Sequence, residues 1–310
     1  MYFPYLRGKQ FELLALRELV PLMMNNREKV SPIIEPVKNT STLINTLSEL
    51  RKGNINYNIV INPSVGDFKS SQHILDVIKS KQNGYTNFQL GILVEPTANY
   101  QSLLQVIADA KLESSGFAFI HNETIDDIIS IQNEFNKLSP VLYNVINFKR
   151  TNRRYHRIFP AETLVSLDDY FVCLDKNADY LDQESQFSEE HLFYKQDGFK
   201  GFSDFLTIGD NYSEAGFLPR AIAIHISYRD DAGRVRVKHF ASHTNDDNTD
   251  IAGKFAEANE KLVEWCNEKG INTIAINKFR DLHEIGHFPG LGTVKKLSIM
   301  NHIELILNLI

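Results

Sequence analysis

Short apolar runs alternate with amphipathic segments along the first two thirds of the chain. The runs are almost continuously apolar and rich in Val, Ile, Leu or Phe, which is typical of strands covered on both faces. The segments between them repeat apolar residues every three or four positions, which predicts helices. The predicted strands are 4–6, 31–37, 58–63, 89–96, 116–122, 140–148, 163–169 and 205–210, and the predicted helices are 11–22, 42–50, 73–78, 103–110 and 125–135.

This order predicts an α/β fold in which right-handed crossovers join parallel strands. Eight candidate strands favour a TIM-like (β/α)8 barrel, and a doubly wound open sheet is the competing topology. A Gly-x-Gly-x-x-Gly turn does not follow the first strand, so a dinucleotide-binding fold has little support. For the eighth strand, the run at 205–210 competes with the run at 221–228.

The pattern changes after Phe148, where no clear helix follows the sixth strand. Residues 221–228 and 234–241 alternate apolar and polar positions around Asp-Asp-Ala-Gly, which predicts a β-hairpin. A helix is expected over 254–265, with Gly270 well placed to end it, then a further strand at 272–279 and an apolar C-terminal helix. We therefore expect one barrel domain over 1–310, with 211–310 as a C-terminal elaboration of hairpin and helices.

Composition narrows the class of protein. The net charge of −6 argues against a globally basic nucleic-acid-coating protein but leaves room for a local basic groove. Two isolated cysteines, Cys173 and Cys266, form neither a disulfide framework nor a zinc knuckle. Apolar runs stay well short of the roughly 18 residues that span a membrane. We expect a cytoplasmic protein without a membrane partner; an enzyme, a binding module and a subunit of a complex all remain open.

Candidate chemistry lies at the predicted strand ends, because parallel barrels carry their reactive groups there. The runs IIEP and LVEP place Glu35 and Glu95 identically, each directly before proline, and we expect both to converge with Lys9 at one barrel mouth. Two carboxylates in one pocket can divide acid and base roles or hold a divalent cation, a candidate cofactor. The alternative is a structural ion pair with a neighbouring Lys or Arg. The catalytic candidates are Glu35, Glu95, His121 and Asp210.

A basic run, KRTNRRYHR, occupies 149–157 in this acidic protein. Arginine forks match phosphate oxygens, and the interleaved aromatic rings can stack on bases. The run follows the sixth strand, so it is expected at or near the barrel mouth, as an anion or nucleic-acid contact or as a loop paired with the acidic segment 168–190. The candidate anion-binding residues are Arg7, Lys9, Lys38, Lys149, Arg150, Arg153 and Arg154.

Two histidine groups could suggest a metal. His283 and His287 match His-Glu-x-x-His, but Thr293 stands where a metzincin has its third histidine, and glycines and Pro289 leave little room for the helix to continue. We expect no catalytic zinc there; the GHFPGLGT segment is alternatively a glycine-rich loop whose amides meet an anion. The second group, His225, His239 and His243, forms either a metal site or polar hairpin positions.

Several segments resemble the bacterial and phage beta protein family. They are YFPYLRGKQFELLALREL, SPIIEPVK, FLTIGDNYSEAGFLPRAIAIHISY, KHFASH and HFPGLGTVKKLSIMNHI, which together span nearly the whole chain. The resemblance brings no catalytic motif. It implies a cytosolic bacterial accessory protein, encoded beside a nuclease-like companion in mobile or defence-associated regions.

Three functions follow as hypotheses. The first is an accessory or recognition subunit of a bacterial two-component system in anti-phage defence, which acts with a nuclease-like partner and binds nucleic acid or a nucleotide at the barrel mouth. The alternative is a barrel hydrolase acting on a phosphate-containing substrate, with Glu35, Glu95 and Asp210 as acid, base or metal ligands. The third is a zinc-dependent hydrolase that uses the HEIGH segment. Fold alone does not decide between them.

Overall fold

The computed structural model of the protein describes residues 1–68, 70–82, 84–213 and 220–310. Its contacts divide the chain into two compact units, the first formed by Met1–Asp169 with Phe193–Asp204 and the second by Tyr170–Leu192 with Phe205–Ile310. The segment predicted as a C-terminal elaboration, 211–310, contains residues 214–219, which lie outside the described residues. The second unit also takes up 170–192 from the middle of the chain.

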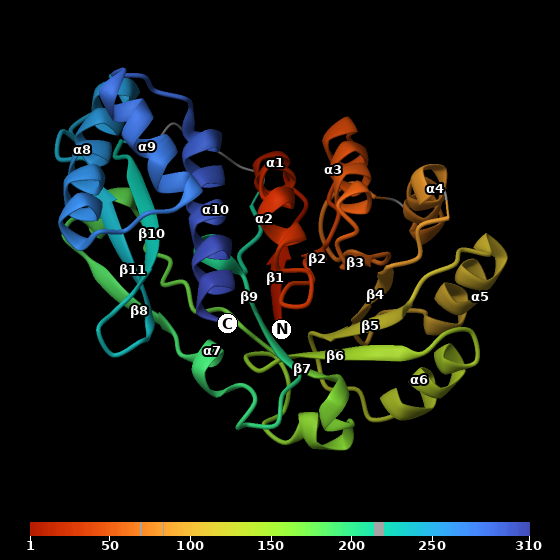
Figure 1. The fold of residues 1–310 in the computed structure, drawn as a ribbon. Coiled ribbons are helices and arrows are strands. Elements are labelled where there is room, and N and C mark those ends of the chain that lie inside the picture. Colours follow the sequence, from red (N-terminus) through yellow and green to blue (C-terminus); the bar gives the residue numbers. More distant parts are fainter. Residues whose placement is uncertain (69, 83, 214–219) are drawn as a thin grey trace. The chain divides into compact units, whose positions relative to one another are not determined.

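The first unit contains a closed barrel of parallel strands, a TIM-like fold (Figure 1). The strands are paired in the order β1-β2-β3-β4-β5-β6-β7-β9, and β9 closes the barrel by pairing with both β7 and β1. The predicted barrel is therefore confirmed. Its strands are β1 (Tyr2–Leu6), β2 (Ile33–Ile34), β3 (Tyr57–Val60), β4 (Phe88–Val94), β5 (Gly116–His121), β6 (Val141–Asn147), β7 (Leu164–Asp168) and β9 (Gly201–Asp204).

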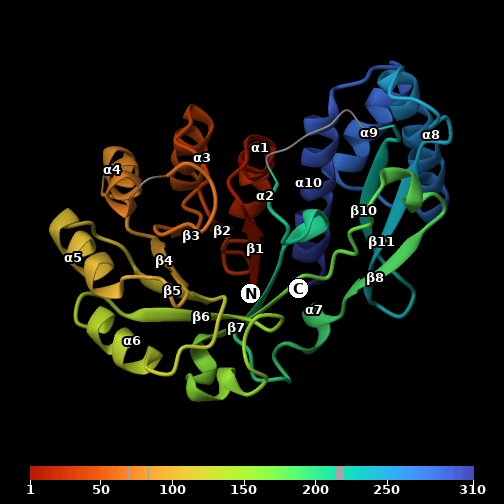
Figure 2. The same cartoon turned by 180° about the vertical axis from the view of Figure 1, so that it is seen from behind.

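Helices follow the first five strands and contact one another in sequence around the outside of the barrel (Figure 2). They are α1 (Gln10–Glu18), α2 (Val20–Met24), α3 (Ser41–Lys52), α4 (Ser71–Gln82), α5 (Tyr100–Ala110) and α6 (Ile128–Asn136). Between β6 and β7 the chain forms only the short 3-10 turns η1 (Tyr155–Ile158) and η2 (Ala161–Thr163). This agrees with the sequence pattern, which shows no amphipathic period there.

The strand register shows which side chains face the barrel interior. Phe3 pairs in register with Ser203, and its ring meets the ring of Tyr143 at 4.9 Å across the interior. Phe117 and Phe119 face the other way, because both rings pack edge-on against Phe135 of α6. Strand residues alternate between the two sides, so these contacts fix the inner and outer positions of every paired strand.

The eighth strand was predicted in the wrong place. The barrel closes with Gly201–Asp204, whereas the predicted run 205–210 contains only the 3-10 turn η4 (Leu206–Ile208). The strand that closes the barrel has a single large apolar side chain, Phe202. Its Ser203 is buried, and the Ser203 hydroxyl donates a hydrogen bond to the carbonyl of Phe3 at 2.5 Å. Such a strand carries little apolar signal. The competing run, 221–228, belongs to the second unit.

The second unit is built on a three-stranded antiparallel sheet in the order β10-β11-β8. The predicted hairpin is confirmed by β10 (Ala223–Arg229) and β11 (Val235–Ala241), which pair from Ala223 opposite Ala241 to Arg229 opposite Val235. The sequence pattern did not indicate β8 (Glu184–Ser188), which pairs with β11. The unit also contains η3 (Asn177–Tyr180), α8 (Ile251–Lys269), α9 (Ile274–Glu284) and α10 (Leu291–Leu309), and α7 (Glu190–Phe193) ends where the chain returns to the first unit.

The strand predicted at 272–279 is wrong, because these residues form the start of α9. Thr273 caps this helix, its side chain accepting a hydrogen bond from the backbone N–H of Ile276 at 3.1 Å. The buried residues Ala275, Ile276 and Phe279 then fall on one helical face. A short apolar run fits either a strand or a helix, and here the cap decides.

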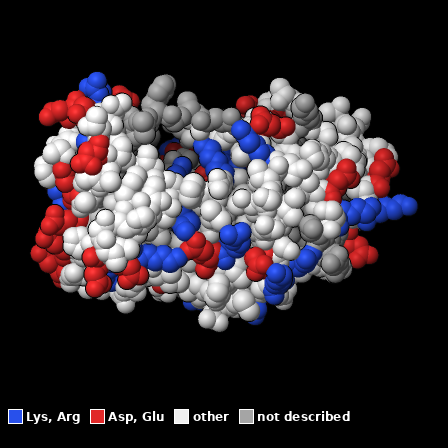
Figure 3. Space-filling model, turned by 90° about the horizontal axis from the view of Figure 1, so that it is seen from above, with Lys and Arg blue, Asp and Glu red and all other residues white. Residues whose placement is uncertain are grey.

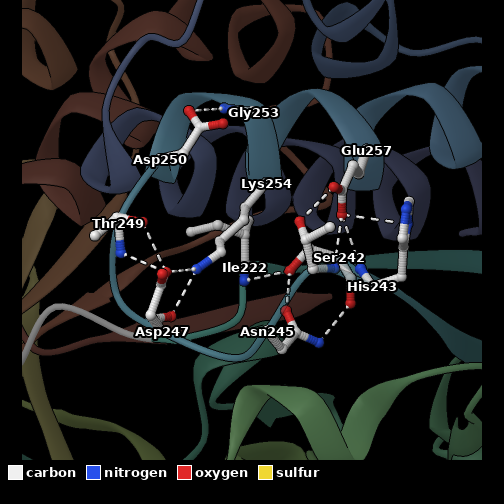
Figure 4. Close-up of polar contacts among 11 residues, drawn as sticks. Ile222, Ser242, His243, Asn245, Asp247, Thr249, Asp250, Gly253, Lys254 and Glu257 are labelled. Carbon is white, nitrogen blue, oxygen red and sulfur yellow. Dashed lines mark hydrogen bonds and ion pairs between the residues drawn. The ribbon is translucent and has the colours of Figure 1, made fainter.

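The loop before α8 is tied to that helix by side-chain contacts (Figure 4). The carboxylate of Glu257 accepts hydrogen bonds from the backbone N–H groups of His243 and Thr244 at 2.8 and 3.2 Å. Lys254 is 3% exposed, and its ammonium group donates to the carbonyl of Asp247 at 2.6 Å. These bonds satisfy a buried charge and fix the loop. Gly270 ends the helix in the left-handed conformation, as predicted.

Candidate functional site

Seven strands of the barrel place a polar residue on the inner side at their C-terminal ends. Each position continues the inward alternation of its strand, and the parallel topology brings all seven to one end of the barrel. We call this set the mouth ring. It contains one cation, three carboxylates and three amides: Arg7, Glu35, Asn62, Glu95, Asn122, Asn147 and Asp169.

Glu35 is completely buried and fully engaged. One carboxylate oxygen accepts from the Tyr5 hydroxyl at 2.8 Å and from the Arg7 guanidinium, which forms an ion pair with it. The other oxygen accepts from the backbone N–H and the hydroxyl of Ser64 at 2.9 and 3.0 Å. A buried carboxylate needs such compensation, since an unpaired charge there would be strongly destabilising.

Two glycines let the loops close around Glu35. Gly8 has a φ of +62°, and a Cβ atom there would lie 3.0 Å from the carbonyl oxygen of Glu35. Gly66 has a φ of +91°, and its Cβ would lie 2.3 Å from the carbonyl oxygen of Val37. The loop after β3 can therefore lie directly on the loop after β2, which brings Ser64 to the carboxylate.

Glu95 holds the equivalent position after β4, but its surroundings differ. It is half-buried, and within the described residues its carboxylate makes no hydrogen bond or ion pair. Its backbone is held instead by Tyr100, whose hydroxyl accepts from the N–H of Glu95 and donates to its carbonyl at 3.0 and 2.9 Å. The structure thus brings Glu35 and Glu95 to the same barrel end, with one carboxylate saturated and the other open.

The three amides of the mouth ring have different partners. The side chain of Asn62 bridges to β4, donating to the carbonyl of Leu93 and accepting from its N–H, both at 2.9 Å. Asn147 donates to the side-chain oxygen of Asn122 at 3.4 Å, and both residues are buried. None of these three asparagines was among the candidate residues predicted from the sequence. Asn122 is the last residue of the fifth predicted strand, 116–122. The inward alternation of the fifth strand would have indicated it.

The end of β7 is held by Lys149. Its ammonium group donates to the carbonyl of Asp169 and lies 3.7 Å from the carboxylate of Asp168. Burial raises the pKa of Asp168, although the hydrogen bond from the Asp169 N–H and the charge of Lys149 act in the opposite direction. One member of the basic run is thus paired with the acidic residues at the end of β7.

His121 faces away from the barrel interior, on the same side of β5 as Phe119. It is completely buried, with Nε2 donating to the side-chain oxygen of Asn144 at 3.0 Å and Nδ1 accepting from the Tyr155 hydroxyl at 3.1 Å. Burial lowers its pKa to about 3, so the ring is neutral at ordinary pH. The structure therefore places His121 in the packing layer under α6, apart from the inner face that holds Glu35.

The remaining basic candidates are dispersed. Arg153 and Arg154 are exposed, and the exposed Lys38 lies 3.3 Å from the carboxylate of Asp67. Arg150 is also exposed, and its N–H bonds to the carbonyl of Asn147, which joins the start of the basic run to the mouth ring. Lys9 directly precedes α1. Figure 3 shows acidic and basic side chains interspersed on one face, in keeping with the net charge of −6.

Asp210 does not end a barrel strand. It follows η4 and belongs to the second unit, so it is not part of the mouth ring. The side chain that ends the eighth strand is Asp204, which is buried and accepts from the Tyr2 hydroxyl at 2.8 Å on the outer side of the barrel. The placement of Asp210 at a strand end was a consequence of the shifted eighth strand.

The histidine groups have separate geometries. Helix α9 ends at Glu284, between His283 and His287, so the two rings do not share one helical face. Nδ1 of His225 lies 2.7 Å from Nδ1 of His239, whereas His243 lies 3.2 Å from a Glu257 oxygen. Across the described ranges, no group of three or more His, Cys, Asp or Glu side chains is arranged to hold a metal ion.

Comparison of the chain with models of known families, with curated proteins and with solved structures gives no match. Within the part of the chain that the structure describes, no helix combines the length and apolar character needed to cross a bilayer.

Proposed function

We propose that the barrel mouth binds a nucleotide or a segment of nucleic acid, and that the chain is the recognition subunit of a bacterial two-component system in anti-phage defence. The observation that carries this proposal is the mouth ring, in which Glu35 is used to fix the site while amides and a second carboxylate remain on the inner face. A carboxylate with every acceptor position occupied serves positioning better than proton transfer.

The residue types of the ring match nucleobase edges. Asparagine amides offer a donor and an acceptor side by side, the pattern that reads adenine, and carboxylates such as Glu95 accept from the amino group of cytosine. The exposed Arg153 and Arg154 follow the strand that ends in Asn147 and offer guanidinium groups for phosphates. Base recognition and charge neutralisation would thus come from neighbouring parts of the first unit.

The partner is proposed on different grounds. The resemblance to the bacterial and phage beta protein family supports a nuclease-like protein encoded nearby, and a recognition site without an evident acid–base pair supports a division of labour between two chains. Co-expression of this chain with the product of the neighbouring gene, followed by purification through a tag on one chain, tests the complex directly.

Binding at the mouth is tested with Asn122→Leu and a short labelled single-stranded oligonucleotide of mixed sequence. The substitution keeps the side-chain volume and removes its polar atoms, so we expect affinity to fall by about tenfold or more. Asn87→Leu is the matched control, because Asn87 lies before β4 at the opposite end of the barrel. Equal affinities of wild type and Asn122→Leu would contradict the proposal.

The contribution of the arginines to binding can be measured through the salt dependence of the affinity. Replacing Arg153 and Arg154 with Gln should weaken binding at all sequences and lower the slope of log affinity against log salt by about 0.7 for each lost single-strand phosphate contact. Lys137→Gln, a change at the exposed lysine that directly follows α6, should leave the slope unchanged.

The carboxylate of Glu95 is the observation that favours the alternative function, a hydrolase. A half-buried carboxylate on the inner face can act as a base or hold a divalent cation. Incubation of a phosphate ester or oligonucleotide with the protein and Mg²⁺ separates the two functions. Turnover that Glu95→Gln abolishes supports the hydrolase, whereas binding without turnover supports recognition.

A further inference from the structure

The second unit contains a cavity that the barrel site does not use. Its volume is about 280 Å³, and it is open to solvent on one side and lined by residues before and within η3, by η4, by the start of β10 and by the first two turns of α10. Among the described residues, its lining includes Lys295 and His225 but no aspartate or glutamate. A cavity whose described lining offers a cation and no carboxylate favours an anionic occupant.

The N-terminus of α10 forms one wall of the cavity. The helix is 19 residues long, begins at Leu291 and has no side-chain cap at Gly290. Leu291, Val294 and Lys295 lie on the face that lines the cavity. The positive end of the helix dipole and the Lys295 ammonium group therefore act on the same space. Within the described residues, Lys295 has no ion-pair partner.

Thr207 gives an independent indication of a ligand. It belongs to η4, lines the cavity and is 3% exposed, yet its hydroxyl has no hydrogen-bond partner among the described atoms. A buried hydroxyl without a partner is costly, and a bound oxygen acceptor would remove that cost.

The other lining groups suit an organic ligand. Asn177 donates to the carbonyl of Ala221 at 2.9 Å, which leaves its side-chain oxygen as an acceptor. His225 is held by His239 and by the ring of Tyr180 at 4.6 Å, and burial lowers the pKa of His225 to about 3, so it offers a neutral ring. Apolar side chains such as Phe171 complete the walls.

We infer that this cavity binds a small phosphate monoester, with the phosphate between the N-terminus of α10, Lys295 and the Thr207 hydroxyl and the organic part against the apolar wall. The donors come from two elements, the N-terminus and Lys295 of α10 and the Thr207 hydroxyl of η4, and together they can surround the oxygens of a phosphate group. The proposal is independent of the barrel mouth, since every residue in it belongs to the second unit.

The two cysteines provide the readout. Cys173 is exposed and lines the cavity, whereas Cys266 is buried and burial raises its pKa to about 12. A thiol reagent such as dithionitrobenzoate added to the folded protein therefore modifies Cys173 first. We expect phenyl phosphate to slow this reaction in a saturable manner. Inorganic phosphate should protect more weakly because it lacks the apolar part.

Variants then test the assigned contacts. Thr207→Val and Lys295→Gln should each weaken protection by phenyl phosphate by about tenfold or more. Lys296→Gln is the matched control, since the next residue of the helix is outside the cavity lining. Lys295→Gln changes an exposed side chain and keeps the test valid if Thr207→Val fails to fold. Absence of protection at millimolar phenyl phosphate, equal protection by benzoate, or an equal loss in Lys296→Gln would overturn the proposal.

Discussion

Glu35 and Glu95 show how far the surroundings of a residue decide its chemistry. Both follow an apolar strand and precede proline, and both lie on the inner face of one barrel. Glu35 is enclosed by Tyr5, Arg7 and Ser64, whereas the Glu95 carboxylate is free of such partners in the described part of the chain. The ion-pair interpretation describes the first residue, and the binding interpretation is kept for the second.

The burial of His121 leads to a prediction of how the free energy of unfolding depends on pH. Its folded-state pKa of about 3 lies below the ordinary value of 6.5, so the unfolded chain binds the additional proton between these limits. The stability contributed by the neutral ring is complete above pH 6.5 and is lost as the pH falls. At pH 5 the free energy of unfolding should be lower by roughly 2 kcal/mol because of this residue.

The measurement is urea unfolding at pH 7 and pH 5. The wild type should lose more free energy of unfolding between these values than His121→Gln, which has no group to protonate. His283→Gln, the same change at an exposed histidine, should follow the wild type. If His121→Gln and the wild type lose the same amount, His121 is not the buried neutral ring described here.

At the scale of elements, the mouth depends on the contact between the loops after β2 and β3. Gly66 permits this contact because it combines a positive φ with a close approach to Val37. Any side chain at Gly66 would push away the loop that carries Ser64, and Glu35 would lose two hydrogen bonds. The site is therefore a property of two loops as well as of the strand ends.

This gives a prediction with a built-in control. Gly66→Ala should destabilise the protein by more than the roughly 1 kcal/mol expected for a left-handed alanine alone, because the new methyl group also meets backbone. Gly84→Ala has a similar φ of +77° and nothing within 4 Å of its Cβ, so it should show the conformational cost alone. Thermal unfolding of both variants measures the difference, and equal shifts in Tm would contradict the close contact.

At the scale of the whole molecule, the parts with strong periodicity were predictable. Seven barrel strands, the hairpin and the helix ended by Gly270 follow from doubly buried runs, alternation and a glycine cap. The strands β8 and β9 were missed because ESQFS and GFSD are short and polar, and their burial comes from partners far away in the sequence. The sequence predicted an ion pair of Glu35 with a neighbouring Lys or Arg only as one of two alternatives. The partner, Arg7, is determined by the register between the first two strands, which the sequence does not reveal.

The mouth ring is proposed here as the binding site of a nucleotide-type ligand. The most direct test is NMR of the labelled protein during titration with a single-stranded oligonucleotide, with the side-chain amide signals of Asn122 and Asn147 assigned by mutation. We expect these two signals to shift in a saturable manner, while the indole signal of Trp265 in the second unit does not shift. Binding that leaves both amide signals unchanged, or that shifts only the indole, would contradict the claim.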